Sequence, residues 1–351
     1  MKRILMVCES FGGGVFAYVV QLCNDMCGDF DIYLAYGLRS QTPSNFKDLL
    51  DSRVHLIEVP NFGNLKKIGK TIKFLRNIDK EIKPDIIHLH SSIAGGIGRI
   101  AFKKRKESVI YTPHGFAHIL LGGGFKSWVY KRMEKMLGNR ALTLTCCESE
   151  EVEAKKFSKR TTYIETGINI EEFDKVLQNI KPIEKEEFSV FTLGRICPQK
   201  QPKVFNEIAE MCPDIKFIWI GDGELKNELT APNIEITGWL PRMEALALAK
   251  QADVFILCSL GEAIAMSLLE NMYLKKICLV SKKIGNISVI VNEKNGFVCE
   301  KPEEYAKIVK AISKNYPLGI STNAYNDIVT IYNTKIMKEK YVDFYNSFSN
   351  Q

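Results

Sequence analysis

Short apolar runs alternate with longer helical patterns along the whole 351-residue chain. The runs that predict strands lie at 3–8, 31–36, 54–59, 85–90, 108–113, 141–146 and 161–166 in the first half, and at 188–194, 215–221, 233–238, 253–258 and 276–281 in the second. Continuous apolar strands separated by helices indicate parallel sheets that are covered on both faces. The pattern therefore predicts an α/β fold.

A polar stretch rich in lysine and glutamate, residues 171–187, interrupts this alternation. We interpret it as a linker between two Rossmann-like domains, residues 1–170 and 188–334, and the chain is long enough for two such cores. The tail, residues 335–351, carries apolar residues at helical spacing and is predicted to form a terminal helix that packs back on the body, with 1–170 as its candidate partner. No repeat of 20–50 residues is visible, which argues against a solenoid.

The composition, with 46% hydrophobic and 25% charged residues, is that of an ordinary globular protein. No apolar run approaches the roughly 20 residues that span a bilayer. The N-terminal MKRILMVCESFGGG is interpreted as a strand and a loop because it lacks the features of a signal peptide. The ten cysteines lack zinc-like spacing, and several lie in apolar strands, so a reducing, cytoplasmic location is expected.

The net charge of +7 is unevenly distributed. Residues 1–170 contain 26 Lys and Arg against 17 Asp and Glu, a net charge of +9. The basic clusters lie at 66–83, 103–106 and 126–135. They are either solvated helix faces or a surface that attracts anionic phospholipid, where each basic residue contributes about 1 kcal/mol. Nucleic acid is a weaker candidate partner because the clusters lack interleaved aromatic residues.

A glycine-rich loop follows the first predicted strand. Gly12, Gly14 and Ala17 fit the G-x-G-x-x-A pattern of dinucleotide-binding proteins. That pattern also needs an acidic residue after the second strand, which ends here in AYGLRS, so a nicotinamide cofactor is disfavoured. The glycines still let a ligand approach the backbone closely, although a tight turn without any ligand explains them equally well.

Three sets of polar residues in the first half are candidates for binding or chemistry. His114 lies in TPHG, where a strand breaks into a loop, and it is either a sugar-binding residue or a satisfied loop histidine. His88 and His90 form an H-x-H pair that suggests a metal site, but no third ligand is evident and a structural role is favoured. Asp29 and Asp31 precede a strand, away from the carboxyl ends at which parallel sheets bind ligands.

Two cations in the second half follow a strand at that favourable end. Arg195 comes directly after the strand at 188–194, and Lys200 stands at the start of the next predicted helix, where Pro202 fixes the first turn. Two cations beside a helix N-terminus suit a diphosphate, and they would also stabilise the charge that develops on a leaving nucleotide. The alternative is an exposed pair of surface charges.

Two further turns follow strands in the second half. Gly221 and Asp222 belong to the turn GDGE, and Trp239 and Leu240 to the turn GWLP. The second turn offers backbone groups and an apolar edge to a nucleobase. The stretch NEKNGFVC, residues 292–299, is interpreted as one more turn.

Glu262 and Glu270 lie eight positions apart in EAIAMSLLE, which follows an apolar strand. If the whole interval were helical, a rise of about 1.5 Å per residue would separate them by about 12 Å. That is the reach of a sugar joined to a diphosphate and a ribose. Backbone amides between the glutamates are candidates to hold the phosphates. The spacing alone is common, so its meaning depends on the motifs around it.

The ordered set GGG, TPHG, GR…K, GDGE, GW, E-x7-E and NGF resembles the large group-1 family of retaining GT-B glycosyltransferases, which are glycosyltransferase family 4-like. The segment that ends in TPHGF is particularly similar to members that build capsular or exopolysaccharide. The resemblance implies α/β architecture with two Rossmann-like domains whose parallel sheets face each other across a cleft. It implies an acceptor-binding N-terminal domain and a C-terminal domain that binds a nucleotide sugar.

The resemblance also implies roles for individual residues. Arg195 and Lys200 would hold the diphosphate, Glu270 the ribose and Glu262 the donor sugar. His114 would lie at the anomeric carbon, and the loop at Gly13 and Gly14 would abut the β-phosphate or the acceptor. The remaining candidate donor-binding residues are Gly221, Asp222, Leu240, Ala263, Ile264 and Ala265. Neither a metal nor another cofactor is implied.

Two departures from the family pattern stand out. Gln201 replaces a frequent glycine, and Ala263, Ile264 and Ala265 replace the usual aromatic-glycine segment after the first glutamate. Backbone amides remain, but the segment offers no aromatic ring. This puts the identity of the donor sugar in question.

These residues predict a metal-independent retaining glycosyltransferase at the inner face of the cell membrane, cytoplasmic and peripherally bound. It would transfer a hexose or N-acetylhexosamine from a nucleotide sugar, UDP-linked by expectation, to a lipid-linked saccharide in capsule, exopolysaccharide or O-antigen synthesis. Two alternatives remain open: a nucleotide-sugar 2-epimerase of the same architecture and a non-catalytic subunit that binds a nucleotide sugar. An oxidoreductase is a more distant alternative.

Overall fold

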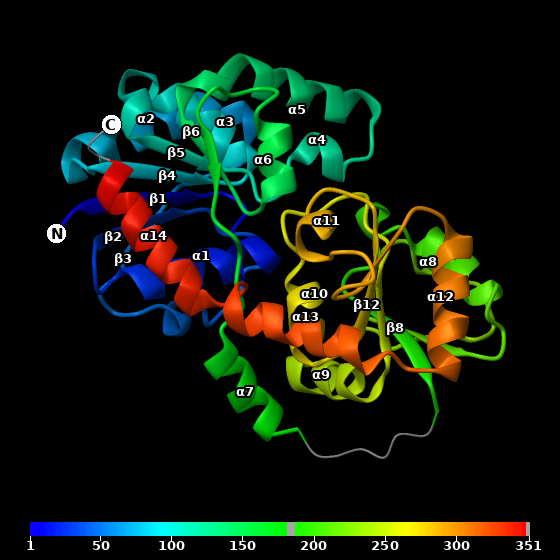
Figure 1. Cartoon of the computed structure of the whole chain (residues 1–351). Helices are drawn as coiled ribbons and strands as arrows, with labels where there is room; N and C mark the ends of the chain where they lie inside the picture. Colours follow the sequence, from blue (N-terminus) through cyan, green and yellow to red (C-terminus); the bar gives the residue numbers. More distant parts are fainter. Residues whose placement is uncertain (181–186, 349–351) are drawn as a thin grey trace. The chain divides into compact units, whose positions relative to one another are not determined.

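A computed structural model describes residues 1–180 and 187–348 and divides the chain into two compact units (Figure 1). Unit 1 comprises Met1–His118, Gly123–Glu165 and Met337–Gln351, and unit 2 comprises Ile119–Gly122 and Thr166–Ile336. The stretch interpreted as a linker contains most of a helix, α7 (Ile170–Gln178), whose Phe173 is buried in contact with Tyr273 of unit 2. Residues 181–186 of that stretch lie outside the described residues.

Unit 1 is built on a seven-stranded parallel sheet in the order β3-β2-β1-β4-β5-β6-β7. The strands are β1 (Arg3–Cys8), β2 (Asp31–Tyr36), β3 (His55–Glu58), β4 (Ile86–His90), β5 (Val109–Thr112), β6 (Leu142–Thr145) and β7 (Thr161–Tyr163). The helices are α1 (Gly13–Met26), α2 (Ile68–Ile82), α3 (Ser92–Ala101), α5 (Gly124–Leu137) and α6 (Glu148–Ala154). Two further helices, α4 (Ala117–Leu120) and α14 (Thr334–Phe348), cross a unit boundary, and α14 belongs to unit 1 from Met337 onward. Figure 1 shows α2, α3, α5 and α6 on one face of this sheet and α1 with α14 on the other.

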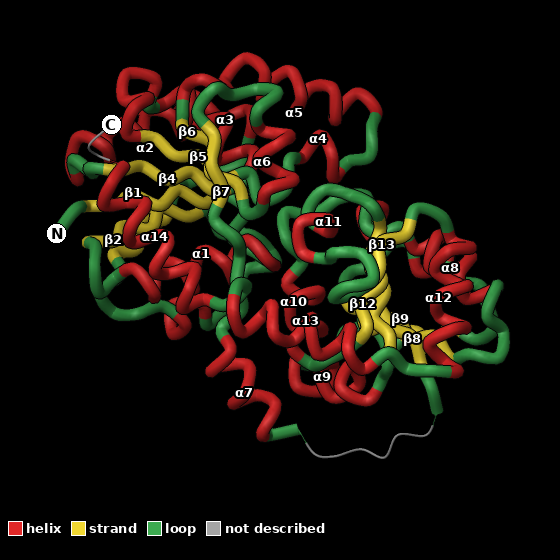
Figure 2. The backbone as a smooth tube through the Cα atoms, viewed as in Figure 1, coloured by secondary structure: helices red, strands yellow, loops and turns green. Residues whose placement is uncertain are grey.

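Unit 2 has a six-stranded parallel sheet in the order β10-β9-β8-β11-β12-β13 (Figure 2). Its strands are β8 (Ser189–Leu193), β9 (Lys216–Ile220), β10 (Ile234–Ile236), β11 (Val254–Leu257), β12 (Ile277–Ser281) and β13 (Phe297–Cys299). Besides α7, its helices are α8 (Pro202–Glu210), α9 (Arg242–Gln251), α10 (Met266–Tyr273), α11 (Asn286–Val289), α12 (Pro302–Lys314) and α13 (Leu318–Thr330). Helices α8 and α12 cover one face, and α10 and α13 the other.

All twelve predicted strands are present, and the expected α/β fold is confirmed. The turn predicted within residues 292–299 is present at 293–295, but the sequence did not predict that Phe297–Cys299 adds the edge strand β13. The Asn295–Gly296 pair is a strong turn signal, and it outweighed the short apolar run that follows it.

The terminal helix α14 packs against the sheet of unit 1 through buried tyrosines. The hydroxyls of Tyr341 and Tyr18 lie 2.6 Å apart, and the Tyr345 hydroxyl lies 2.7 Å from Nδ1 of His88. The other ring nitrogen of His88 lies 2.8 Å from the Thr112 hydroxyl. Both nitrogens of His88 are therefore engaged in the core, which supports the structural interpretation of the H-x-H pair.

The cysteines are consistent with a reduced core. All ten lie among the described residues, all are buried, and none forms a disulfide. Burial raises the pKa of several of their thiols, including Cys23 and Cys278, so these behave as small apolar side chains.

Candidate functional site

A cavity of about 230 Å³ opens at the carboxyl ends of strands β8 and β9 in unit 2. It is lined by Leu193, Gly194, Ile220, Gly221, Trp239, Leu240, Arg242, Ala245, Leu246 and Glu270. Three predicted donor-binding residues, Gly221, Leu240 and Glu270, thus border one hollow. Open parallel sheets bind their ligands at this end of the strands.

Two glycines fix the floor of the cavity. Gly194 and Gly221 have φ angles of 140° and 142°, in the region that favours glycine. A Cβ atom added to Gly221 would lie 2.2 Å from the carbonyl oxygen of Gly194. The indole nitrogen of Trp219 donates to that same oxygen at 2.9 Å. The two strand ends are therefore held close together before any ligand arrives.

Glu270, on α10, supplies the acidic wall of the cavity. It is only 7% exposed, and its Oε1 accepts a hydrogen bond from Nη2 of Arg242 at 2.7 Å. Burial raises the pKa of Glu270, and the Arg242 charge partly opposes that effect. The arginine keeps a carboxylate in place where a pair of ligand hydroxyls would find an acceptor.

Lys200 lies beside Gly194, which lines the cavity. A Cβ atom added to Gly194 would lie 3.8 Å from Cε of Lys200. The ammonium group of Lys200 donates to Oε1 of Glu262 at 2.7 Å, and the Ser259 hydroxyl donates to the same oxygen at 2.6 Å. Oε2 of Glu262 accepts from Nε2 of Gln199 at 3.0 Å. The two predicted residues are therefore an ion pair, and both oxygens of Glu262 are engaged.

The interval between Glu262 and Glu270 is not one helix. Residues 262–265 form a loop, and α10 begins only at Met266. Ile264 and Ala265 are buried, whereas Ala263 is half-buried. The distance calculated for a continuous helix therefore does not apply, because a loop occupies half of the interval. Two of the three residues that replace the family's aromatic-glycine segment, Ile264 and Ala265, therefore have buried side chains.

The other predicted residues of unit 2 lie around this region. Arg195 follows Gly194 and is exposed, and within the described residues it forms no side-chain hydrogen bond or ion pair. Oδ1 of Asp222 accepts from the Gly223 amide at 2.8 Å, so this side chain stabilises its own turn. Gln201 has a φ angle of 50°, which explains why a glycine suits that position.

His114 lies in unit 1, at the carboxyl end of β5, and has a φ angle of 55°. Such left-handed backbone in a non-glycine residue is costly and concentrates at functional sites. Its Nε2 lies 3.0 Å from Nδ1 of His90, and its ring meets the Tyr18 ring edge-on at 4.7 Å. Burial lowers the pKa of His114 to about 3, so the imidazole is neutral at physiological pH.

A buried glutamate holds the His114 loop in place. One oxygen of Glu150 accepts from the Gly115 amide at 2.7 Å, and the other accepts from the Cys146 amide at 3.0 Å. Glu150 thereby joins the ends of β5 and β6. Burial raises the pKa of Glu150 to about 7, and the two amide hydrogen bonds oppose this shift.

The predicted glycine loop of unit 1 is accessible. Gly13 begins α1 with a φ angle of 57°, and a Cβ atom added to Gly13 or Gly14 would meet no other atom within 4 Å. The first amides of a helix attract anions, and nothing in the described structure crowds these two positions.

Two sequence models of known families match the chain. The model of group 1 glycosyl transferases matches residues 174–327, and that of glycosyltransferase family 4 matches residues 12–172. The UDP-Gal:alpha-D-GlcNAc-diphosphoundecaprenol alpha-1,3-galactosyltransferase of Escherichia coli is 30% identical over 332 residues, which cover 85% of each chain. The chain belongs to the group 1 family of glycosyl transferases.

Other relatives of this group 1 glycosyl transferase agree with that assignment. The capsular polysaccharide biosynthesis glycosyltransferase CapM of Staphylococcus aureus is 24% identical over 329 residues, 83% of each chain. The crystal structure of Anabaena HepE in complex with UDP and glucose matches 99% of this chain and 100% of its own, with a TM-score of 0.78 and 17% identity. The protein is thus a glycosyltransferase of GT-B architecture, as the sequence predicted.

The sequence did not single out several residues that build the two sites of this glycosyl transferase. In unit 2 these are Arg242, Gln199 and Ser259, and in unit 1 they are Glu150 and Tyr18. Arg242 directly follows the GWLP turn, so a search for cations next to that turn would have found it. The other four carry no motif of their own, and only the fold brings them to their partners.

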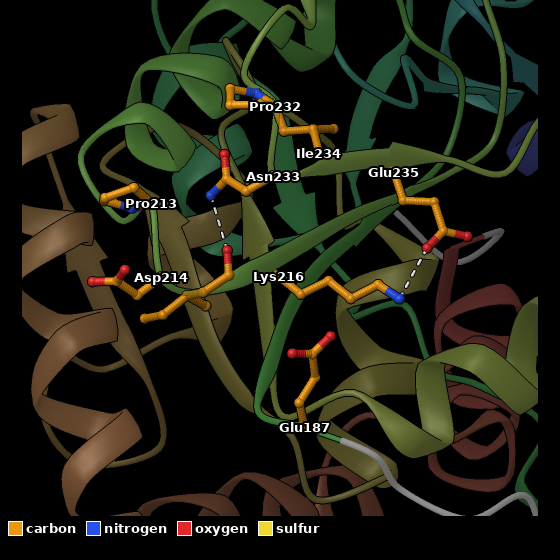
Figure 3. A pocket seen from close by; sticks show the side chains of 9 residues that line it. Glu187, Pro213, Asp214, Lys216, Pro232, Asn233, Ile234 and Glu235 are labelled. Atoms are coloured by element: carbon orange, nitrogen blue, oxygen red, sulfur yellow. Dashed lines mark hydrogen bonds and ion pairs between the residues drawn. The ribbon is translucent and has the colours of Figure 1, made fainter.

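A second hollow of this group 1 glycosyl transferase, of about 390 Å³, lies at the opposite, amino end of strands β9 and β10 (Figure 3). Lys216 there pairs with Glu235 at 3.0 Å, and Asn233 donates to the backbone carbonyl of Ile215 at 2.9 Å. Although this hollow is larger than the cavity at Glu270, its position does not suit a nucleotide, and none of the predicted site residues lines it.

Gly285 offers a test of the Glu262 loop in this glycosyl transferase. Its φ angle is 84°, and an added Cβ atom would lie 2.6 Å from the carbonyl oxygen of Glu262 and 2.7 Å from that of Ala263. Gly285→Ala should therefore displace the loop, lower stability by about 1–3 kcal/mol and reduce turnover. Thermal melting and initial rates measure both effects. Gly319→Ala, which meets nothing within 4 Å, is the matched control, and equal behaviour of the two variants would contradict this reasoning.

Proposed function

We propose that this enzyme transfers a hexose or N-acetylhexosamine from a UDP-sugar to a lipid-linked saccharide in capsule, exopolysaccharide or O-antigen synthesis, with retention of configuration. One observation carries the proposal: the Glu270 carboxylate lines the cavity, and the Lys200 side chain lies next to Gly194, another residue that lines it. A carboxylate suits ribose hydroxyls and a cation suits a diphosphate, so the cavity matches the two constant parts of a nucleotide sugar. The Escherichia coli relative is named for a UDP-galactose donor and a diphosphoundecaprenol-linked acceptor.

In this proposal, Lys200 and Arg195 hold the diphosphate and stabilise the charge that develops on it as the glycosidic bond breaks. Glu262 contacts the donor sugar and orients Lys200. Because both of its oxygens already accept hydrogen bonds or an ion pair, Glu262 is poorly suited to act as a covalent nucleophile. This favours a front-face route, in which the departing diphosphate helps to remove the proton of the attacking hydroxyl.

In the proposal, unit 1 binds the acceptor and contacts part of the donor. His114, held neutral in its strained loop, contributes a hydrogen bond to a sugar hydroxyl, and the amides at Gly13 and Gly14 approach a phosphate or the acceptor. Asp222 and the segment 263–265 contribute to donor binding mainly through their backbone. The two cations supply positive charge at the diphosphate, and on this ground we propose that no metal is required.

We also propose that the enzyme works at the inner surface of the cell membrane. Within residues 1–180 and 187–348, no helix is both long and apolar enough to cross a bilayer. The net charge of +9 on residues 1–170 supports binding to anionic lipid.

The test is transfer by the purified protein, with a panel of UDP-linked hexoses and N-acetylhexosamines and a short-chain lipid-diphosphate saccharide as acceptor. We expect donor-specific transfer that a chelator leaves unchanged and a product whose anomeric configuration, read by NMR coupling constants, equals that of the donor. Conversion of the donor to its 2-epimer without acceptor would instead establish the epimerase alternative. Absence of both hydrolysis and transfer with every donor that binds would indicate a non-catalytic subunit.

A further inference from the structure

The H-x-H pair of strand β4 is connected to His114. His90, the second histidine of the pair, is fully buried, and its Nδ1 lies 3.0 Å from Nε2 of His114. The two ring planes are inclined by only 22°, with centroids 5.2 Å apart, which suits an N–H···N hydrogen bond in the plane of the rings. A residue that the sequence indicated to be structural is thus bonded directly to a candidate site residue.

Both of these rings are neutral. Burial lowers the pKa of His90 well below its usual value, and the neighbouring His88 and His114 lower it further. Burial lowers the pKa of His114 to about 3. A neutral imidazole donates a hydrogen bond from one nitrogen and accepts one at the other. The nitrogen of His114 that carries the proton is therefore determined by the neighbours of the ring.

Met6, on β1, determines the tautomer of His90. Its sulfur lies 3.5 Å from Nε2 of His90, and both side chains are 0% exposed. A thioether accepts hydrogen bonds weakly and cannot donate one. A lone pair on Nε2 would face the sulfur without a donor, which buried polar groups avoid. The proton of His90 is therefore on Nε2, and its Nδ1 is an acceptor.

His90 in turn determines the tautomer of His114. Because Nδ1 of His90 accepts, Nε2 of His114 must donate, and Nδ1 of His114 keeps its lone pair. The Sγ atom of Cys146 lies 3.7 Å from that Nδ1. A thiol is a weak donor, so Nδ1 is the ring atom of His114 that can still accept a stronger hydrogen bond.

We propose that Met6 and His90 are positioning residues that hold His114 in the tautomer protonated at Nε2, so that His114 accepts a hydrogen bond from a donor-sugar hydroxyl at Nδ1. The edge-on contact of the Tyr18 ring, at 4.7 Å, helps to fix the orientation of the imidazole. The inference rests on the proposed function in one respect, because the sugar contact of His114 belongs to it. It adds the direction of that contact: the sugar must supply a hydroxyl that donates.

The first experiment reads the tautomer by NMR. The chain has five histidines, so full-length protein labelled with ¹⁵N at histidine gives few imidazole signals in a ¹H–¹⁵N correlation through two bonds. The signals of His114 are those that disappear in His114→Gln. We expect a protonated Nε2 and an unprotonated Nδ1 for His114 in the wild type. A protonated Nδ1 would overturn the proposal.

Met6→Leu tests whether the thioether sets the tautomer. Leucine keeps the volume of the side chain but removes the acceptor, and such swaps are well tolerated in cores. Both tautomers should then be populated, so the two nitrogen signals of His114 should shift towards each other. Met26→Leu is the matched control, because Met26 on α1 is also 0% exposed and should keep the wild-type spectrum. An unchanged His114 tautomer in Met6→Leu would refute the role of Met6.

Two substitutions of His90 separate positioning from packing. His90→Leu removes the acceptor for the His114 proton and should raise the KM for the donor about five- to tenfold, the effect of one hydrogen bond. His90→Asn retains an oxygen acceptor on a short side chain and should recover most of that loss. Melting temperatures report the packing cost of each variant. An equal rise in KM for both variants would assign His90 a packing role alone.

Fluorinated donors test the sugar contact and separate this inference from the proposed function. UDP-sugars with one hydroxyl replaced by fluorine keep the shape of the sugar, but fluorine cannot donate a hydrogen bond. At one ring position the replacement should weaken binding to the wild type about five- to tenfold and have no such effect on His114→Gln. Equal effects on both proteins at every position would overturn the contact. Transfer by a wild type with the opposite tautomer would refute this inference and leave the proposed function standing, whereas the predicted tautomer without binding of any nucleotide sugar would refute the function and, with it, the contact.

Discussion

Replacing Lys200 with alanine should lower the transfer rate about 100- to 1,000-fold, because removal of a positioned transition-state charge contact costs about 2.7–4 kcal/mol. Lys200 lies beside Gly194, which lines the cavity, and its side chain is largely buried, only 17% exposed. Within the described part of the chain, its substitution also leaves the Glu262 carboxylate with Ser259 and Gln199 as its remaining side-chain partners. The effect should appear mainly in kcat, since charge on the diphosphate grows as the bond to the sugar breaks.

A neighbouring lysine provides the control for this experiment. Lys203 lies on α8 close to Lys200 in the sequence, but its side chain is 75% exposed, and among the described residues its one ion pair is a long, 3.8 Å contact with Glu228. Lys203→Ala should keep the wild-type rate within about twofold, because exposed ion pairs contribute little. Melting temperatures of both variants report whether the fold is intact. A Lys200→Ala enzyme that is folded and fully active would remove Lys200 from the proposed chemistry.

The fold was predictable because buried parallel strands appear in the sequence as short, continuous apolar runs. Strands such as β1 and β12 consist of consecutive apolar residues, and their interior positions are 0% exposed. Parallel order at the two sheets then follows from the helices between strands. Strand β13 escaped prediction because the turn signal of Asn295 and Gly296 dominates that stretch. The case of one continuous helix from Glu262 to Glu270 does not occur, because a loop occupies half of the interval.

The placement of Gly221, Leu240 and Glu270 around one cavity follows from a topological rule, since all three come after strands of one parallel sheet. The pairing of side chains does not follow from any such rule. Lys200 pairs with Glu262, which is 62 residues away in the chain, and Arg242 pairs with Glu270, which is 28 residues away. The same limit applies to Glu150, whose two backbone partners come from the ends of two different strands.

The orientation of α5 shows the limit in another way. The sequence marks 126–135 as a basic cluster, but it contains an acidic residue, Glu134, that would reduce the charge of a solvated face. Only the buried partners Arg99 and Tyr111 show that Glu134 points inward. The outward side of α5 is for this reason more cationic than the sequence alone indicates.

Glu270→Gln should reduce kcat/KM for the donor about 10- to 100-fold, mainly through KM, and weaken binding of free UDP by a similar factor. A hydrogen bond to a charged group contributes about 1.5–3 kcal/mol, and glutamine keeps the volume of the side chain while it removes the negative charge. Because ribose is common to every UDP-sugar, the factor should be the same for all donors that the enzyme accepts. Glu244→Gln, an exposed acid in the first turn of α9, is the matched control and should bind UDP as the wild type does.

The buried state of Glu270 adds a pH dependence to that result. Burial raises the pKa of this carboxyl, so it takes up a proton at a higher pH than an exposed glutamate does. If the ionised form binds ribose, UDP affinity of the wild type should fall as the pH is lowered through that raised pKa, and Glu270→Gln should lack this part of the pH profile. Calorimetric titration of UDP across the acidic range measures both enzymes. A loss of affinity that differs from one sugar to another, or identical pH profiles for wild type and variant, would assign Glu270 to the sugar or to the fold instead of the ribose.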